Sequence, residues 1–124
     1  MPAEFSIDPG RRMVFSRATG VVTVADVLGH MDRLSRHTDF RPEFSQIIDF
    51  REAAEVRLSS DEVQEIARRN VFAAESRRAI LVTPGLQFGL ARMFATYREL
   101  AGEQGIHIFT DAAEARSWVS LPEE

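Results

Sequence analysis

The stretch Arg78-Ala79-Ile80-Leu81-Val82-Thr83, followed directly by Pro84-Gly85, decides the fold class. Its apolar residues run without interruption instead of alternating with polar ones. This pattern is typical of a strand buried on both faces, and such strands occur mainly in parallel sheets covered by helices. Proline and glycine favour a turn, so they mark the end of the strand. The sequence therefore predicts a central strand of an α/β sheet.

Helical patterns flank this strand on both sides. Before it, Ser59 and Glu62 form a capping box that predicts the start of a helix. The apolar face of that helix comprises Val63, Ile66, Ala67, Asn70 and Val71. After the strand, an apolar stripe at helical spacing comprises Leu86, Leu90, Met93, Phe94, Tyr97 and Leu100, before Gly102 and Gly105. Helices on both sides of a buried strand indicate crossover connections.

Further towards the N-terminus, a helix is predicted over residues 23–37. Thr23 and Asp26 form a second capping box, and apolar residues follow at helical spacing. The opposite, polar face comprises Asp26, His30, Arg33 and His37. The turn Phe40-Arg41-Pro42 leads to a short strand over residues 46–50, and an irregular stretch is expected over residues 51–58.

The two ends of the chain complete the pattern. Residues 4–8 alternate in polarity, Asp8-Pro9-Gly10 predicts a turn, and a second strand follows around residues 13–17. Near the C-terminus, a strand over 106–109 precedes a short helix that begins at Asp111. The predicted order is β-β-α-β-α-β-α-β-α, with a mostly parallel five-stranded sheet whose first strand is antiparallel. The 124 residues form one domain, 1–124.

Composition excludes several functions. The chain has no Cys, and all 15 of its Lys and Arg residues are Arg, so thiolate and lysine chemistry are absent. The net charge of −4 and the scattered arginine pairs argue against nucleic-acid binding. No targeting signal and no run of ~20 apolar residues are present, so no membrane span is predicted and the cytoplasm is the expected location.

Catalytic and metal-binding motifs are also missing. The patterns G-x-S-x-G, G-x-G-x-x-G and H-E-x-x-H do not occur. His30 and His37 are separated by roughly 10.5 Å along a helix axis, too far to share a metal, and are expected to face solvent. His107 alternates with Ile106 and Ile108, which favours a structural or edge position. We therefore predict no catalytic residues, no metal and no cofactor.

A ligand or partner would be expected where strands end and helices begin. The residues predicted at that edge are Asp49, Arg51, Ser59, Ser60, Thr83, Pro84, Gly85, Thr110 and Asp111. Phe88 lies off the main apolar stripe of its helix, close to Arg92. Packing beneath the helix start is favoured for Phe88, and the alternative is an exposed aromatic that meets a ligand or partner while Arg92 pairs with an acidic group. The candidate binding residues are Asp49, Thr83, Phe88 and Arg92.

Ser59 and Ser60 are open to two interpretations. The simpler is that Ser59 caps the helix that follows it, which contributes ~1 kcal/mol. The alternative is a phosphorylation site, because a phosphate is tolerated at a helix start and adds negative charge to a partner surface.

Three segments together carry a family resemblance. They are Asp8-Pro9-Gly10-Arg11-Arg12, the pair Phe40-Arg41-Pro42 and Ile47-Ile48-Asp49-Phe50, and Phe88-Gly89-Leu90-Ala91-Arg92-Met93-Phe94. With this element order the chain resembles the SpoIIAA-like branch of the STAS fold over nearly its whole length. Proteins of that branch are mostly small bacterial proteins of unassigned role, and the related fold includes anti-sigma-factor antagonists and lipid-carrying SEC14-type domains.

The resemblance also bears on function. The antagonists carry a phosphorylatable serine in an Asp-Ser-Ser-Gly-like turn, whereas this chain has Leu58-Ser59-Ser60-Asp61. The leading Asp and the Gly are therefore missing. SEC14-type domains are much larger, and 124 residues leave little room for an enclosed lipid.

Three functions follow from these observations. The first is a non-enzymatic binding or regulatory module that acts through an unidentified protein partner, with a homodimer possible. The second is a binder of a small apolar or amphipathic, lipid-like ligand, with its site near Phe88, Arg92 and the helix starts. An apolar pocket with one arginine would support this function, and a solid core at that place would contradict it. The last is a small hydrolase that uses Asp49 or His107 with Ser59 or Ser60.

Overall fold

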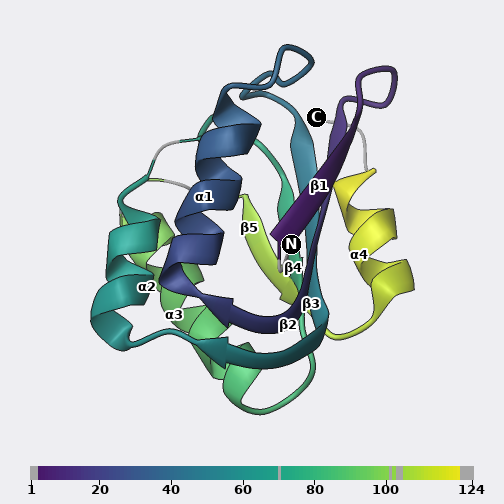
Figure 1. Ribbon diagram of the computed structural model, residues 1–124. Helices are drawn as coiled ribbons and strands as arrows, with labels where there is room; N and C mark the ends of the chain where they lie inside the picture. The colour runs from purple at the N-terminus through teal and green to yellow at the C-terminus, as the bar shows by residue number, and fades with distance from the viewer. Residues whose placement is uncertain (1–2, 70, 101, 103–104, 121–124) are drawn as a thin grey trace.

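The protein contains one sheet with strands in sequence order. The computed structural model describes residues 3–69, 71–100, 102 and 105–120 (Figure 1). The sheet order is β1-β2-β3-β4-β5, and its strands are β1 (Ala3–Asp8), β2 (Met13–Thr23), β3 (Ser45–Arg57), β4 (Arg78–Leu81) and β5 (Ile106–Phe109). β1 is antiparallel to β2, and the remaining pairs are parallel. The predicted element order and fold class are confirmed.

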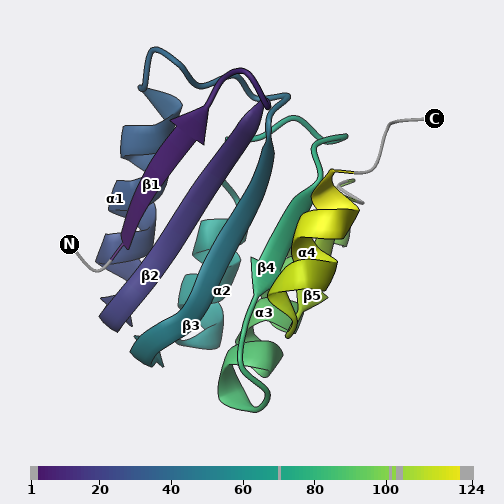
Figure 2. The ribbon, with the colours of Figure 1, turned by 90° about the vertical axis from the view of Figure 1, so that its right-hand side faces the viewer.

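Helices cover both faces of the sheet unequally. α1 (Val24–Ser35), α2 (Ser60–Ala67) and α3 (Leu86–Leu100) connect successive parallel strands and lie together on one face, whereas α4 (Ala112–Val119) lies on the other (Figure 2). Each crossover from β2 to β5 moves in the same direction across the sheet. Since such crossovers are right-handed, their helices must share one face. α4 follows the last strand and is free of this constraint.

Local sequence signals explain where the helices begin. Both predicted capping boxes form, with the side chain of Thr23 accepting from the backbone of Asp26 and that of Ser59 accepting from the backbone of Glu62. Asp111 caps α4 by accepting from the backbone N–H of Glu114. These contacts satisfy backbone donors that a helix start leaves unpaired.

The strand that decided the fold class is buried as predicted. Every residue of β4 is buried. Ala79 packs with Ala115 and Val119 under α4, and Ile80 packs with Ala91 under α3. The apolar stripe of α3 ends earlier than predicted, because Leu100 is 81% exposed. Of the apolar face predicted after Ser59, Val71 lies beyond the end of α2, and Asn70 lies outside the described residues.

The expectation of an irregular stretch over residues 51–58 is wrong. β3 continues to Arg57 and pairs with β2 as far as Thr23, with register shifts after Arg17 and Gly20. β4 pairs with β3 only up to Asp49, so β2 and β3 extend beyond it as a two-stranded ribbon. Burial of Val22 with Ala18 and Ala53 holds this ribbon against α1.

Candidate functional site: an apolar cavity with a buried polar row

A cavity of about 120 Å³ lies between the sheet and the layer formed by α1, α2 and α3. Its wall is mostly apolar. The sheet contributes Ile48, Phe50, Val56, Ile80, Val82 and Ile106. The helices contribute Val27, Met31, Leu34, Val63, Ile66, Leu90, Ala91 and Phe94. The cavity therefore lies between the sheet and its helices and is partly open to the surface.

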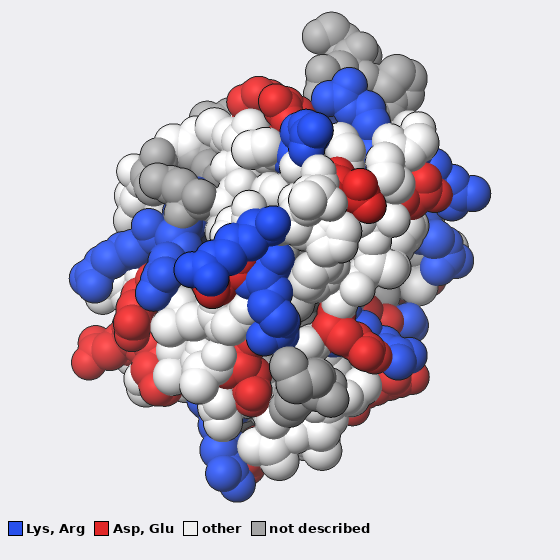
Figure 3. Space-filling model, turned by 45° about the horizontal axis from the view of Figure 1, so that its top comes forward, with Lys and Arg blue, Asp and Glu red and all other residues white. Residues whose placement is uncertain are grey.

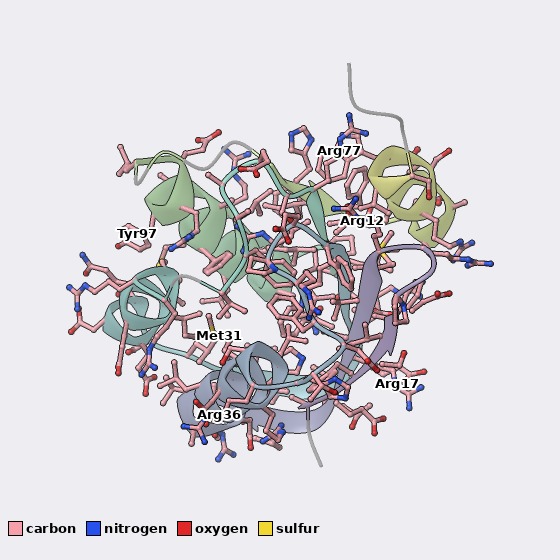
Figure 4. All side chains as sticks on the ribbon, turned by 90° about the horizontal axis from the view of Figure 1, so that it is seen from above. Arg12, Arg17, Met31, Arg36, Arg77 and Tyr97 are labelled. Atoms are coloured by element: carbon pink, nitrogen blue, oxygen red, sulfur yellow. The ribbon has the colours of Figure 1, made fainter. Side chains whose placement is uncertain are left out.

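The arrangement of the helices explains the cavity. On this face of the sheet, Val14 and Leu34 belong to one buried cluster, and Ile80 and Ala91 belong to another. The cavity borders both clusters. Figure 4 shows Met31 reaching from α1 into the space that faces α2, whereas Arg17 lies on the side of the sheet that carries α4. The buried apolar residues on this face thus form separate clusters rather than one continuous core.

A row of buried polar side chains crosses this otherwise apolar layer. Gln46 Nε2 donates to Ser16 Oγ at 3.0 Å, and Ser16 Oγ lies 3.0 Å from His30 Nε2. All three side chains are buried. Ser16 Oγ accepts from Gln46 and can donate its own proton to His30 Nε2 when the ring proton of His30 is on Nδ1. Such a network satisfies groups whose burial would otherwise be costly.

His30 is therefore not on a solvent-facing surface, and that prediction is wrong. It is 5% exposed, and its ring meets the edge of Phe5 at 5.4 Å between centroids. Burial, with a smaller contribution from the charge of Arg33, lowers the pKa of His30 to about 4. The helical spacing could have predicted this burial. His30 follows Val27 by three residues and precedes Leu34 by four, so it lies on the apolar face of the helix.

Arg78 extends the polar row to β4. It pairs in register with Gln46 on the neighbouring strand and is 7% exposed. Its guanidinium carbon lies 5.0 Å from the centroid of the Phe72 ring, so the cation rests on an aromatic face. Arg78, Gln46 and His30 all line the cavity. Sequence reasoning did not select Ser16, Gln46 or Arg78, since strand register alone brings them together.

Asp49, a predicted site residue, lies on the other face of the sheet. Its carboxylate accepts from the backbone N–H of Arg51 at 2.9 Å and from its guanidinium at 3.1 and 3.0 Å. Burial disfavours the charged form of Asp49, but these bonds outweigh that effect and lower its pKa. Arg51 is also influenced by the charge of Asp111, so part of the predicted edge cluster does gather.

The remaining predicted binding residues lie around α3. The backbone N–H of Thr83 donates to Gln87 Oε1 at 3.1 Å, which ties the end of β4 to the first turn of the helix. Phe88 is half-buried and packs against Ile80, Val82 and Ala91, the interpretation that the sequence favoured. Arg92 is exposed. Gln87 lines the cavity, whereas Thr83, Phe88 and Arg92 do not.

The residues considered for hydrolysis are not brought together. Ser59 caps α2 through bonds of 3.2 and 2.9 Å with Glu62, and Ser60 is exposed. His107 is exposed on β5 and stacks on Trp118 of α4 at 4.3 Å between centroids. Ser59 therefore lies in the layer of α2, and His107 lies on the face of α4.

The described part of the chain contains no helix long and apolar enough to span a membrane. His, Asp and Glu side chains in the same part form no group of three that could hold a metal ion. Figure 3 shows arginine side chains interspersed with acidic ones over the top of the molecule. Both signs of charge are thus mixed on this surface.

Comparison with solved structures agrees with the fold. The chain is similar to an uncharacterised protein of the DUF3478 family with a SpoIIAA-like fold from Shewanella loihica. The two share 18% sequence identity over 94% of this chain and 93% of the other, with a TM-score of 0.62. No protein-family model and no curated protein matches the chain. The protein therefore has a SpoIIAA-like α/β fold, as the sequence resemblance implied.

Proposed function

We propose that this protein is a non-enzymatic binding module that takes a small apolar or amphipathic ligand into the cavity beneath α1, α2 and α3. The single observation that carries the proposal is the apolar cavity of about 120 Å³ with one arginine in its wall. The sequence placed such a ligand near Phe88 and Arg92, whereas neither of these residues lines this cavity.

The size of the cavity limits the ligand. An engineered cavity of about 150 Å³ in another protein stays dry and binds benzene. A cavity of about 120 Å³ therefore suits a ligand of the size of a single ring or a short chain. Apolar lining on both the sheet and helix sides favours transfer of such a group from water.

Binding of 1-hexanol can test this proposal by calorimetry and by amide chemical shifts. We expect saturable binding, with shifts centred on residues of β3, α2 and α3 that line the cavity. Ala91 is buried in the cavity wall, so Ala91→Met should fill the space and weaken binding. Ala113 is exposed on α4, so Ala113→Met is the matched control and should bind normally. Absence of saturable binding, or equal binding by both variants, would contradict the proposal.

A second candidate function is association with a protein partner through the uncovered part of the sheet. Figure 2 shows α4 in front of the sheet with β1 and β2 beside it. Arg17 there pairs with Glu4 at 2.9 Å and with Glu52 at 3.6 Å, and Val21 is 41% exposed. A second copy of this chain is the favoured partner, because a face of mixed charge can complement itself about a twofold axis.

A further inference from the structure

We infer that the ligand of the cavity carries one hydroxyl group, which Gln46 and His30 of the polar row bind while the apolar wall holds the remainder. This inference rests on the proposed function and adds the chemical class of the ligand. A small neutral alcohol or phenol fits it, with phenol as the probe.

The first argument is that the polar row has two side-chain atoms without a partner. Gln46 and His30 are each more than nine-tenths buried, and the hydrogen bond that each side chain forms is with Ser16. Within the described part of the chain, no group bonds to Gln46 Oε1 or to His30 Nδ1. Polar atoms of buried side chains normally have a partner. Because both side chains line the cavity, a molecule in the cavity can supply that partner.

The second argument is the kind of hydrogen bond that these two atoms offer. When Gln46 Nε2 donates to Ser16 and Ser16 donates to His30 Nε2, the ring proton of His30 is on Nδ1. Gln46 Oε1 is then an acceptor, and His30 Nδ1 is a donor. Where donation along the row runs in the opposite direction, the two side chains exchange these roles. In both arrangements the row offers one donor and one acceptor, and a hydroxyl group can pair with either.

The third argument is the position of the polar row within the wall. Gln46, Ile48 and Phe50 are alternate residues of β3, and all three line the cavity. The wall thus changes from polar to apolar along one strand, as a ligand with one polar group and an apolar body requires. A cavity of about 120 Å³ suits a single ring, so phenol matches both the size and the polarity of the site.

The test compares phenol with benzene in the wild-type protein by calorimetry at neutral pH, where both probes are uncharged. The two probes share one ring and differ in the hydroxyl group. A hydroxyl group buried without a partner should weaken binding roughly 30-fold or more, because the loss of its hydration is not compensated. With the polar row as its partner, phenol should bind within about tenfold of benzene. Gln46→Met should weaken phenol binding roughly tenfold and leave benzene binding nearly unchanged.

Gln64→Met is the matched control. Gln64 lies on α2 outside the cavity wall, so the same replacement there should preserve phenol binding. Two results would overturn the hydroxyl inference and leave the proposed function intact. They are wild-type binding of phenol more than about tenfold weaker than that of benzene, and unchanged phenol binding by Gln46→Met. Binding of neither probe by the wild-type protein would overturn both. The wild-type comparison decides the matter even where Gln46→Met does not fold.

Discussion

At the scale of single residues, burial of His30 couples stability to pH. The pKa of His30 is lowered from 6.5 to about 4 by burial and by the charge of Arg33. The unfolded chain therefore binds a proton more readily than the folded protein. The stabilising contribution is complete above pH 6.5 and is lost as the pH falls towards 4. The lowered pKa of His30 corresponds to a pH-dependent contribution to the free energy of unfolding on the order of 3 kcal/mol.

Urea unfolding between pH 7 and pH 4 can measure this contribution. The stability difference between the wild-type protein and His30→Gln should shrink as the pH falls, because only the wild-type protein loses the contribution of a neutral imidazole. His37 is exposed just beyond α1, so His37→Gln should follow the wild-type pH dependence. A stability difference that stays constant across this range would refute the assignment.

Two glycines should respond in opposite directions to alanine. A Cβ at Gly105 would lie 2.0 Å from the carbonyl oxygen of Ser76, next to the 2.7 Å bond from Arg78 N to Gly105 O. Gly105→Ala should therefore destabilise the protein by several kcal/mol, in the range of severe packing changes. Gly89 is exposed within α3 with nothing within 4 Å, so Gly89→Ala should stabilise it by roughly 0.5–1 kcal/mol. Thermal unfolding of both variants checks the opposite signs.

At the scale of elements, Arg98 of α3 anchors the end of α2. Its guanidinium donates to the backbone oxygens of Ala67 and Arg69, carbonyls that the helix end leaves without helical partners. Arg98 is buried, so Arg98→Met should cost roughly 1.5–3 kcal/mol of stability, the range for hydrogen bonds from a charged group. It should also accelerate amide exchange in α2.

Arg92 provides the control on the same helix. It is exposed, so Arg92→Met should change stability by less than about 0.5 kcal/mol. Because α2 forms one wall of the cavity, looser anchoring of this helix should weaken 1-hexanol binding in Arg98→Met. Unchanged exchange in α2 would show that other contacts hold the helix end.

Elements with a strong local signal could be predicted from the sequence. The apolar run at β4 and the capping boxes at Thr23 and Ser59 depend on neighbouring residues alone. The extension of β3 to Arg57 could not, because its small and charged residues alternate poorly and are held by pairing with β2. Tertiary pairing of this kind overrides a weak local preference.

The polar row shows the same limit for the candidate site. Three residues of this row lie far apart in the chain, namely Ser16, Gln46 and Arg78. In the sequence, each of them is a single polar residue within a predicted strand. Only the register of three strands and the direction of α1 bring their side chains towards His30. Asp49 and Thr83 are predicted site residues because ligands favour the carboxyl ends of parallel strands. This cavity instead lies over the middle of the sheet.

At the scale of the whole molecule, the two faces of the sheet offer different surfaces. The face under α1, α2 and α3 lines the cavity, whereas α4 covers mainly β3, β4 and β5 on the opposite face. Ligand binding and protein association would therefore use separate sides of one sheet. Residues of β2 alternate between these sides, with Ser16 towards the polar row and Arg17 towards the uncovered side. A substitution on one side of the sheet can thus be tested without altering side chains on the other side.

We expect self-association through the uncovered part of the sheet. Sedimentation velocity over a range of concentrations should show a dimer of the wild-type protein. Val21 is 41% exposed on β2, four residues after Arg17, so Val21→Arg would add a charge to that strand and should shift the protein to monomer. Ala25, exposed in the first turn of α1, provides Ala25→Arg as the control that should remain dimeric. A monomeric wild-type protein, or equal dissociation by both variants, would argue against this interface. Because the cavity lies on the other face, Val21→Arg should still bind 1-hexanol normally.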